Sequence, residues 1–460
     1  MDGIRAFLAK VDAVFATRNE DAASDLFTVD QDNATLGSLE QHLSMVSDDQ
    51  IRRLCANHAE KSDVRGLADF VANYLLYCKI ASNLEAHPVD VYAAMSALYG
   101  SFLSVFTMTP DAQWLAVVLM NFSSSIVYWA IQADYTNPNA KELKVSDVVG
   151  KHFNRALNIV ISDKTGNPTH TSKKKALYYL ANQSLRCYFR LHSTRLIPTL
   201  ISNISKASVD LREYPMSEQV THRYYLGRYH LYKLDLRKAE QNLAFAFRNC
   251  EYSDLDYPDP ARGGTTASFR NQRLILIYLT ACRLCLGILP KPGLLQTFGI
   301  DAYFAPLVHA VKFGDLRLLK RSLSLDDNGA TSVGLWLVHK EIYFLLVEKL
   351  TLLCWRSLLR RMCLLTTSSS GQMRVDLRVV LQVIQSMLRT ARAPTSTNAD
   401  EDEEDEYDLS DIEAIVVSLL DQGYIRGYIH AIRKILVLGK TNPFPAVHSV
   451  EVHQIPLPTK

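Results

Sequence analysis

The sequence predicts a mainly α-helical fold in which an array of helical hairpins runs into a C-terminal winged helix. Apolar residues recur at helical spacing from about residue 8 to residue 289, and no long stretch alternates as a β-strand does. Gly and Pro are sparse, at 19 and 16 of 460 residues, which disfavours a turn-rich all-β protein. After Gly423 the pattern changes to short stretches rich in β-branched and aromatic residues, as in a β-hairpin.

The composition predicts a folded protein from a reducing compartment. With 48% hydrophobic and 9% aromatic residues, the chain can bury a large core, which excludes a wholly disordered protein. The 8 cysteines are scattered and lack the spacing of a disulfide framework. The first residues contain no basic segment followed by an apolar stretch, so we expect no signal peptide.

The net charge of +2 hides a segregated distribution. Eight of the nine residues 400–408 are acidic, which leaves 50 basic and 40 acidic residues elsewhere. The rest of the chain is therefore moderately basic and suited to meet polyanions.

One uncharged stretch, residues 112–133, is long enough to span a bilayer. It contains Gln, Asn and Ser residues at six positions, which are unfavourable in lipid. A buried helix pair of a soluble α-protein is the better interpretation, and we expect no membrane insertion.

Residues 176–250 have the pattern of stacked helical hairpins. Leu226 and Gly227 form the large-small pair of a first tetratricopeptide-like helix, and Ala239, Leu243 and Ala246 fit the second helix. Small residues let two helices approach closely. An ordinary antiparallel helix pair explains this segment equally well. Further helices are expected at 269–289, 303–312, 316–324 and 333–364.

The last hundred residues predict a winged helix, because two helices precede a β-hairpin. The first helix is expected at 375–388, and a polar, acidic loop follows it. Ser410 to Glu413 have the spacing of a capping box at the start of the second helix, and Gly423 ends that helix. Strands are expected at 424–430 and 435–438, with a turn between them.

Several segments carry a resemblance to a known family. These are 174–204, 224–247, 271–290 and, most specific, 411–445 with its Gly-Tyr-Ile-Arg-Gly-Tyr-Ile and its Lys-Thr-Asn-Pro-Phe-Pro ending. Over roughly 60–445 the chain resembles PCI-domain proteins. Within them it is most similar to the PCI-domain-containing protein 2 family, which includes the fungal subunit of transcription-and-export complex 2 (TREX-2) and the related signalosome-subunit-12-like proteins.

The resemblance implies a domain plan. We expect a helical segment of unassigned type at 1–60, N-terminal helical repeats at 61–210, a PCI helical subdomain at 211–370, a winged-helix subdomain at 371–445 with an acidic loop at 395–408, and a C-terminal tail at 446–460.

The resemblance also implies a non-enzymatic function in messenger RNA export. A protein of this family pairs through its winged helix with a second PCI protein, a scaffold of the GANP type, and holds a small acidic protein of the Sem/DSS type. We therefore expect a subunit that couples transcription to export in the nucleus, at the nuclear pore, with some cytoplasmic pool. The alternative is a signalosome-subunit-12-like subunit of another assembly, associated with splicing or with the signalosome.

The winged helix supplies the first candidate contacts to RNA or DNA. Strand alternation places Tyr424, Arg426 and Tyr428 on one face, with the two tyrosines as candidate partner contacts. Cations neutralise phosphates, and aromatic faces stack on bases. We expect no sequence preference, because residues 412–420 contain no basic side chain. The candidate nucleic-acid-binding residues are Arg426, Arg433, Lys434, Lys440, Lys312, Lys320 and Arg321.

A further basic strip lies on the repeat-like helices. Arg223, Arg228, Lys233 and Arg237 are candidates to bind an acidic partner peptide by charge complementarity. For this strip, as for the others, a solvated helix or hairpin face defended by Lys and Arg is the alternative.

The sequence contains no motif that favours an enzyme. His-Glu-x-x-His, Gly-x-x-x-x-Gly-Lys and Gly-x-Ser-x-Gly are all missing from the 460 residues. Cys282 and Cys285 have Cys-x-x-Cys spacing, but no second pair of ligands stands near them in the sequence. We therefore expect no metal, no cofactor and no hydrolase or redox activity.

Overall fold

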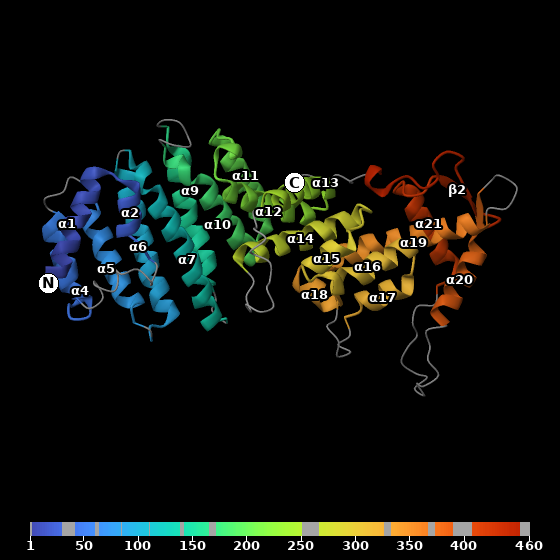
Figure 1. Ribbon diagram of the computed structural model, residues 1–460, viewed down its shortest axis with the longest axis horizontal. Coiled ribbons are helices and arrows are strands. Elements are labelled where there is room, and N and C mark those ends of the chain that lie inside the picture. Colours follow the sequence, from blue (N-terminus) through green and yellow to red (C-terminus); the bar gives the residue numbers. More distant parts are fainter. Residues whose placement is uncertain are drawn as a thin grey trace. The chain divides into compact units, whose positions relative to one another are not determined.

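The computed structural model describes residues 2–29, 42–59, 64–83, 85–109, 111–138, 142–164, 172–250, 266–325, 333–366, 373–389 and 407–450. These residues form a mainly α-helical protein with a small C-terminal sheet, as the sequence predicts (Figure 1). The chain divides into two compact units, Met1–Tyr229 and His230–Lys460. This division falls within a helix, whereas the sequence predicts a boundary between 210 and 211. The predicted domain plan stays a prediction.

The first unit is a succession of helices. Its longer elements are α1 (Asp2–Thr17), α2 (Glu20–Leu26), α4 (Asp48–Ala59), α5 (Leu67–Ala81), α6 (Pro88–Met108), α7 (Ala116–Thr136), α9 (Asn154–Ser162), α10 (Leu177–Arg190), α11 (Ile197–Lys206) and α12 (Met216–Tyr232). Shorter elements are η1 (Ala112–Leu115), α8 (Lys144–Asp147), η2 (Val148–Phe153), η3 (Lys173–Ala176), η4 (Thr194–Leu196) and η5 (Leu211–Glu213).

Buried aromatic rings join α5, α6 and α7 to the N-terminal segment. The ring centroid of Phe70 lies 4.8 Å from that of Phe27 and 5.3 Å from that of Phe102, which in turn lies 5.2 Å from Phe122. All four side chains are fully buried. Such pairs add about 0.5–1.5 kcal/mol each beyond the area they bury. The unassigned first residues are therefore part of the core of this unit.

The uncharged stretch 112–133 is one helix rather than the expected helix pair. The short turn η1 leads directly into α7. Its serines do not break the helix because they bond back to their own turn: Ser123 Oγ donates to Leu119 O at 2.6 Å and Ser124 Oγ to Asn121 O at 2.8 Å. The expectation of two helices is wrong because these serines bond to carbonyls of the same helix and do not interrupt it.

Pro88–Met108 and Ala112–Thr136 are long and apolar enough to cross a membrane by length and composition. About half of the apolar segment in each of these helices is buried within the protein. Core helices of globular proteins have the same length and composition. That the protein does not insert into a membrane stays a prediction.

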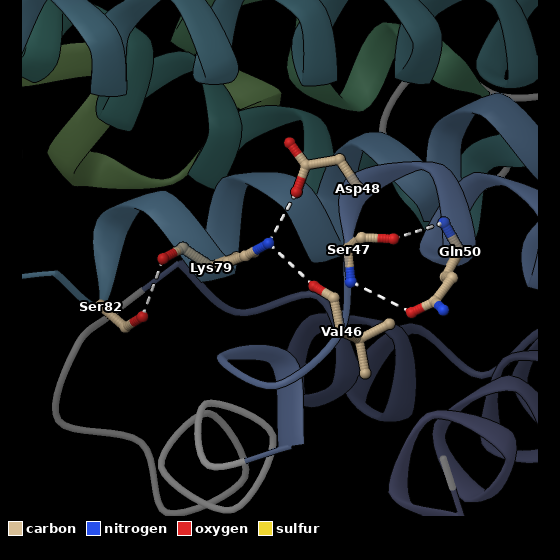
Figure 2. Close-up of polar contacts among 6 residues, drawn as sticks. All are labelled: Val46, Ser47, Asp48, Gln50, Lys79 and Ser82. Carbon is tan, nitrogen blue, oxygen red and sulfur yellow. Dashed lines mark hydrogen bonds and ion pairs between the residues drawn. The ribbon is translucent and has the colours of Figure 1, made fainter.

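A lysine attaches the start of α4 to the end of α5 (Figure 2). Ser47 and Gln50 form a reciprocal cap, in which Ser47 N donates to Gln50 Oε1 at 3.2 Å and Gln50 N to Ser47 Oγ at 3.4 Å. Lys79 Nζ donates to Val46 O at 2.9 Å and to Asp48 Oδ1 at 2.7 Å. Because Lys79 lies in the last turn of α5, its charge also favours that helix end.

The second unit is also mainly helical and ends in the winged helix. Its elements are α13 (Leu236–Asn249), α14 (Ala267–Cys285), α15 (Pro292–Thr297), α16 (Asp301–Phe313), α17 (Leu316–Leu323), α18 (Val333–His339), α19 (Tyr343–Thr366), β1 (Arg374–Asp376), α20 (Leu377–Arg389), α21 (Leu409–Asp421), β2 (Gly427–His430), β3 (Ile435–Leu438) and η7 (Val447–Ser449).

The small residues of α13 are buried as expected, but whether α12 and α13 form a tetratricopeptide-like repeat or an ordinary helix pair stays open. Ala239, Leu243 and Ala246 are fully buried, and α13 packs against α14. The small residues therefore face a neighbouring helix and allow it to approach closely.

The long helix expected at 333–364 is two helices, α18 and α19. The chain turns at Glu341, whose φ is 60°. Glu341 N donates to Val338 O at 2.9 Å and Ile342 N to Leu337 O at 3.1 Å, which is the hydrogen-bond pattern of a Schellman motif. Because glutamate occupies the left-handed position that glycine usually takes, the sequence contains no signal for this break.

The winged helix contains a strand that the sequence does not predict. β1 pairs antiparallel with β3, and β3 pairs with β2, so the sheet order is β1-β3-β2. The helix expected from residue 375 begins only at Leu377, because Val375 lies opposite Leu436 in the sheet and is buried there. A strand of three residues is too short to show alternation.

Two other bounds differ. Asp408 and Asp411 form the capping box of α21, rather than Ser410 and Glu413, because the helix begins two residues earlier than expected. The strand expected from Tyr424 begins at Gly427, while β3 and the turn at 431–434 lie where the sequence predicts them. Of the acidic loop 395–408, only Tyr407 and Asp408 are among the described residues.

Gly314 tests the packing of α16 on α19. Its φ is 71°, and a Cβ added there would lie 2.5 Å from Leu358 N. Gly299 is the matched control, because its φ is 58° and a Cβ would meet nothing within 4 Å. Both alanine variants are destabilised by the left-handed backbone, but only Gly314→Ala also introduces a steric clash. We expect Gly314→Ala to lose about 1–3 kcal/mol more than Gly299→Ala in urea unfolding. Equal losses would contradict the close approach.

Candidate partner and nucleic-acid interface

A buried arginine on α19 holds the winged helix in place. Arg356 is only 8% exposed, and its Nε donates to Tyr424 O at 3.1 Å while its Nη2 donates to Pro445 O at 2.6 Å. The guanidinium also lies 5.7 Å from the centroid of the Phe444 ring. Burial lowers the pKa of Arg356 from its ordinary value. The charge is thus stabilised by carbonyls and a ring that lie on both sides of the hairpin.

The segment after the hairpin returns to the helices of the second unit. Arg426 N donates to Pro443 O at 2.8 Å, which closes this segment against the wing. Val447 packs against Gly287, just beyond α14, and Arg237 Nη2 on α13 lies 3.4 Å from His448 O and 3.3 Å from Val450 O. Residues 443–450 therefore connect the wing to α13 and α14.

Three of the four predicted basic residues of the wing are exposed. Arg426, Arg433 and Lys440 are exposed to solvent, and Lys434 is half-buried. Lys434 pairs with Glu413 of α21, with 2.5 Å between Nζ and Oε1. Its charge is therefore partly neutralised, and the other three residues are better placed to meet phosphates. Their role in binding stays a prediction.

The expected exposed row of Tyr424, Arg426 and Tyr428 is wrong for Tyr424. Tyr424 is buried, as is Ile425 beside it, because residues 424–426 follow the left-handed turn at Gly423 and precede the strand. Burial raises the pKa of Tyr424, and its carbonyl accepts from Arg356. Tyr424 is therefore an anchor of the wing rather than a partner contact.

Tyr428 and Ile432 form an exposed apolar pair on the wing. Tyr428 in β2 is 61% exposed, and Ile432 in the turn is 88% exposed. The sequence analysis did not single out Ile432, although an isoleucine in a turn among Arg, Lys and His was a usable signal. Neighbouring exposed apolar side chains on a strand and its turn are typical of interaction surfaces.

The second basic strip lies on α16 and α17. Lys312, Lys320 and Arg321 are exposed, and Arg317 is half-buried. The helices α16, α17 and α19 pack side by side (Figure 1). That these residues bind nucleic acid stays a prediction.

The strip proposed for an acidic peptide is divided between the two units. In the first unit, the Arg228 guanidinium lies 4.3 Å from the centroid of the Phe189 ring, and Arg223 is half-buried. In the second, Lys233 is exposed and Arg237 contacts carbonyls of the C-terminal segment. That these four residues bind an acidic peptide stays a prediction.

Cys282 and Cys285 are buried within α14. Burial raises the pKa of both thiols, to about 12 for Cys285. A thiol that resists deprotonation is a poor nucleophile and a poor metal ligand. Across the described ranges, no three His, Cys, Asp or Glu side chains are grouped to hold a metal ion.

A buried polar cluster between α10 and α12 escaped the sequence analysis. His222 Nδ1 lies 3.0 Å from Asn182 Oδ1, and Asn182 Nδ2 donates to Glu218 O at 3.0 Å. Burial lowers the pKa of His222 to about 4 and raises that of Glu218 to about 7. At neutral pH the imidazole is uncharged and links the two helices, which is a structural role.

A small polar cavity of about 240 Å³ lies at the C-terminal end of α6. Lys173, one of its lining residues, donates from Nζ to Phe106 O at 2.6 Å and to Thr109 O at 3.4 Å. This lysine therefore stabilises the C-terminal end of α6 by bonding to its free carbonyls. The cavity is smaller than the usual ligand pocket of about 300–1,000 Å³.

Comparison with curated proteins identifies the family, although no family model matches the chain. A PCI domain-containing protein of Schizosaccharomyces pombe is 33% identical over 391 residues, which cover 83% of this chain and 80% of that protein. PCI domain-containing protein 2 of Xenopus laevis is 27% identical over 384 residues, 83% of this chain and 85% of the relative. The homolog of that protein in Dictyostelium discoideum is 27% identical over 406 residues, 86% and 81% of the two chains.

A helical array that ends in a winged helix, together with these relatives, defines a PCI-domain protein. The names of these relatives describe a domain and no enzymatic activity. The chain belongs to the PCI domain-containing protein 2 family.

Replacing Arg356 tests the anchoring of the winged helix. Arg356→Met leaves the carbonyl oxygens of Tyr424 and Pro445 without their donor, which we expect to cost about 2–4 kcal/mol. Hydrogen exchange should become faster throughout residues 409–450. Arg360→Met, at an exposed position on the same helix, is the control and should leave exchange unchanged. Unchanged protection of the wing in Arg356→Met would show that the cation does not hold it.

Proposed function

We propose that the protein is a non-enzymatic scaffold subunit of a nuclear complex that couples transcription to messenger RNA export. In this proposal its winged helix pairs with a second PCI protein, a scaffold of the GANP type, and the pair binds RNA or DNA without sequence preference. The observation that carries the proposal is the exposed apolar pair of Tyr428 and Ile432 between exposed Arg426 and Arg433 on the wing.

The edge of the sheet supports pairing through the wing. β2 is an outer strand in the order β1-β3-β2, so one side of its backbone has no neighbouring strand among the residues that the structure describes. An edge strand that exposes apolar side chains is a surface that proteins usually cover. A partner that packs on Tyr428 and Ile432 would cover this edge.

The anchored position of the wing supports a scaffold role. Arg356 and the segment 443–450 tie the wing to α13, α14 and α19, so a partner bound to the wing is held against the helical array. Exposed Lys233 on the array is a proposed contact for the small acidic Sem/DSS-type protein. We further propose residence in the nucleus, at the nuclear pore, with some cytoplasmic pool.

Affinity purification from nuclear extract tests the pairing. We expect the full-length chain to recover a GANP-type scaffold and a Sem/DSS-type protein. Tyr428→Glu with Ile432→Glu should reduce that recovery at least about tenfold, because it buries charge in the interface. Met45→Glu, at an apolar side chain that is 89% exposed in the first unit, is the control.

Two results would contradict the proposal. One is recovery of splicing or signalosome components in place of the export scaffold, which would support the signalosome-subunit-12-like alternative. The other is equal recovery by the wild-type protein and the wing variant, which would exclude this face as the interface.

Salt-dependent RNA binding by the assembled pair tests the basic face. We expect Arg426→Glu with Arg433→Glu to weaken binding and to flatten the slope of log K against log salt by about 0.7 per lost phosphate contact. Arg52→Glu with Arg53→Glu, two exposed arginines of α4, makes the same change of charge elsewhere. Binding that stays unchanged at every salt concentration would reject the two wing residues.

A further inference from the structure

An exposed aromatic ring at the C-terminal end of α16 is surrounded by basic side chains. Phe313 is 39% exposed. The centroid of its ring lies 5.3 Å from Lys312 Nζ, 5.6 Å from the guanidinium carbon of Arg361 and 4.6 Å from the centroid of the His309 ring. His309, Lys312 and Arg361 are all exposed to solvent. Charge and aromatic surface therefore occur together at one point of the second unit.

Backbone contacts between α16 and α19 fix the position of this cluster. Arg361 Nη1 donates to Phe313 O at 2.7 Å, and Cys354 Sγ to Ala310 O at 3.4 Å. Gly314 approaches the backbone of Leu358 so closely that no side chain fits between them. The aromatic ring and the guanidinium are thus held by two packed helices, which lowers the entropy cost of binding a ligand.

The cluster retains charge for a ligand. A guanidinium carries five N–H donors, and the bond to Phe313 O uses one of them. The nearest acid along the chain, Asp315, accepts from Leu318 N at 3.0 Å as the cap of α17. Its carboxylate keeps its negative charge there, but the two cations Lys312 and Arg361 outnumber it, so the summed charge of these three side chains is positive.

We propose that His309, Lys312, Phe313 and Arg361 form a contact site for one nucleotide of single-stranded nucleic acid. The base rests on the exposed part of the Phe313 ring, and the adjacent phosphate lies between Lys312 and Arg361. A base in a duplex is already stacked and does not reach the ring, whereas an unpaired base does. Every base presents a π-face, so the site has no sequence preference.

This proposal rests on the proposed function and adds a contact to bases to the phosphate contacts of the wing. α19 carries both Arg361 and Arg356, and Arg356 holds the winged helix. The nucleotide site and the wing are therefore attached to one helix. Exposed Lys320 and Arg321 on α17, which packs against α16 and α19, offer further phosphate contacts beside it.

Cations near the C-terminal end of a helix also stabilise that helix, and the experiment separates this role from binding. The full-length protein is titrated at low salt into a fluorescein-labelled oligouridine of about ten nucleotides, a typical site length, with fluorescence anisotropy as the readout. An abasic strand of the same length and charge, and a duplex, are the comparison ligands.

We expect Phe313→Ala to weaken binding of oligouridine about five- to tenfold, which is the lower part of the range for loss of one stacked base. Phe313→Leu keeps the apolar volume and should lose the same affinity, while Phe313→Trp should restore it. The wild-type protein and Phe313→Ala should bind the abasic strand with the same affinity as each other. They should also bind the duplex with the same affinity as each other. Phe344→Ala, at a phenylalanine of α19 that is 81% exposed, is the control and should leave binding unchanged.

The outcomes separate this inference from the proposed function. Equal binding of oligouridine by wild type and Phe313→Ala, or an equal loss on the abasic strand, would overturn the nucleotide site. If Arg426→Glu with Arg433→Glu weakens binding in the same assay, the proposed nucleic-acid function survives that result. Failure of the wild-type protein to bind oligouridine at low salt would overturn the nucleotide site but not the proposed function, which assigns nucleic-acid binding to the assembled pair.

Discussion

Arg356 satisfies backbone carbonyls from two ends of the winged helix, and much of the second unit depends on this arrangement. A buried cation is costly unless its donors are used, and here two of them meet Tyr424 O and Pro445 O. The partners are backbone carbonyls rather than a carboxylate. The guanidinium therefore fixes the position of the backbone at Tyr424 and Pro445. The same helix presents Arg361 to the end of α16, so α19 joins the wing to the preceding helices.

In the first unit, aromatic packing takes the role that the arginine has in the second. Phe27, Phe70, Phe102 and Phe122 connect helices that are distant in sequence, and Lys79 fixes the start of α4 to the end of α5. This packing accounts for two apolar helices of membrane-spanning length. It also gives the unit a continuous core suited to a structural role.

The basic side chains fall into two groups: some contact other groups of the same chain, and others face solvent. Arg228 lies over an aromatic ring, Arg237 contacts carbonyls of its own chain and Lys434 pairs with Glu413. Arg426, Arg433 and Lys440 are exposed on the wing beside Tyr428 and Ile432. This difference, which charge counts cannot show, directs the proposed binding surfaces to the wing and to the end of α16.

The sequence by itself determined the features that depend on nearby residues. The helical periodicity, the buried Ala239, Leu243 and Ala246, strand β3 and its preceding turn follow from local propensity and from alternation of apolar residues. The resemblance of 411–445 to a known family identified the winged helix and, with it, the class of protein. These features can be predicted from the sequence because the residues that produce each of them lie close together in the chain.

Only the tertiary structure decided the features that depend on distant partners. β1 exists because Val375 pairs with Leu436, and Tyr424 is buried because the chain turns before β2 begins. Glu341 adopts a left-handed conformation that its side chain does not favour, because Ile342 and Leu337 close the turn in the core. The roles of Arg356 and Phe313 likewise arise from groups far away in sequence, since hydrogen bonds and ring contacts across the fold leave no periodic pattern in the chain.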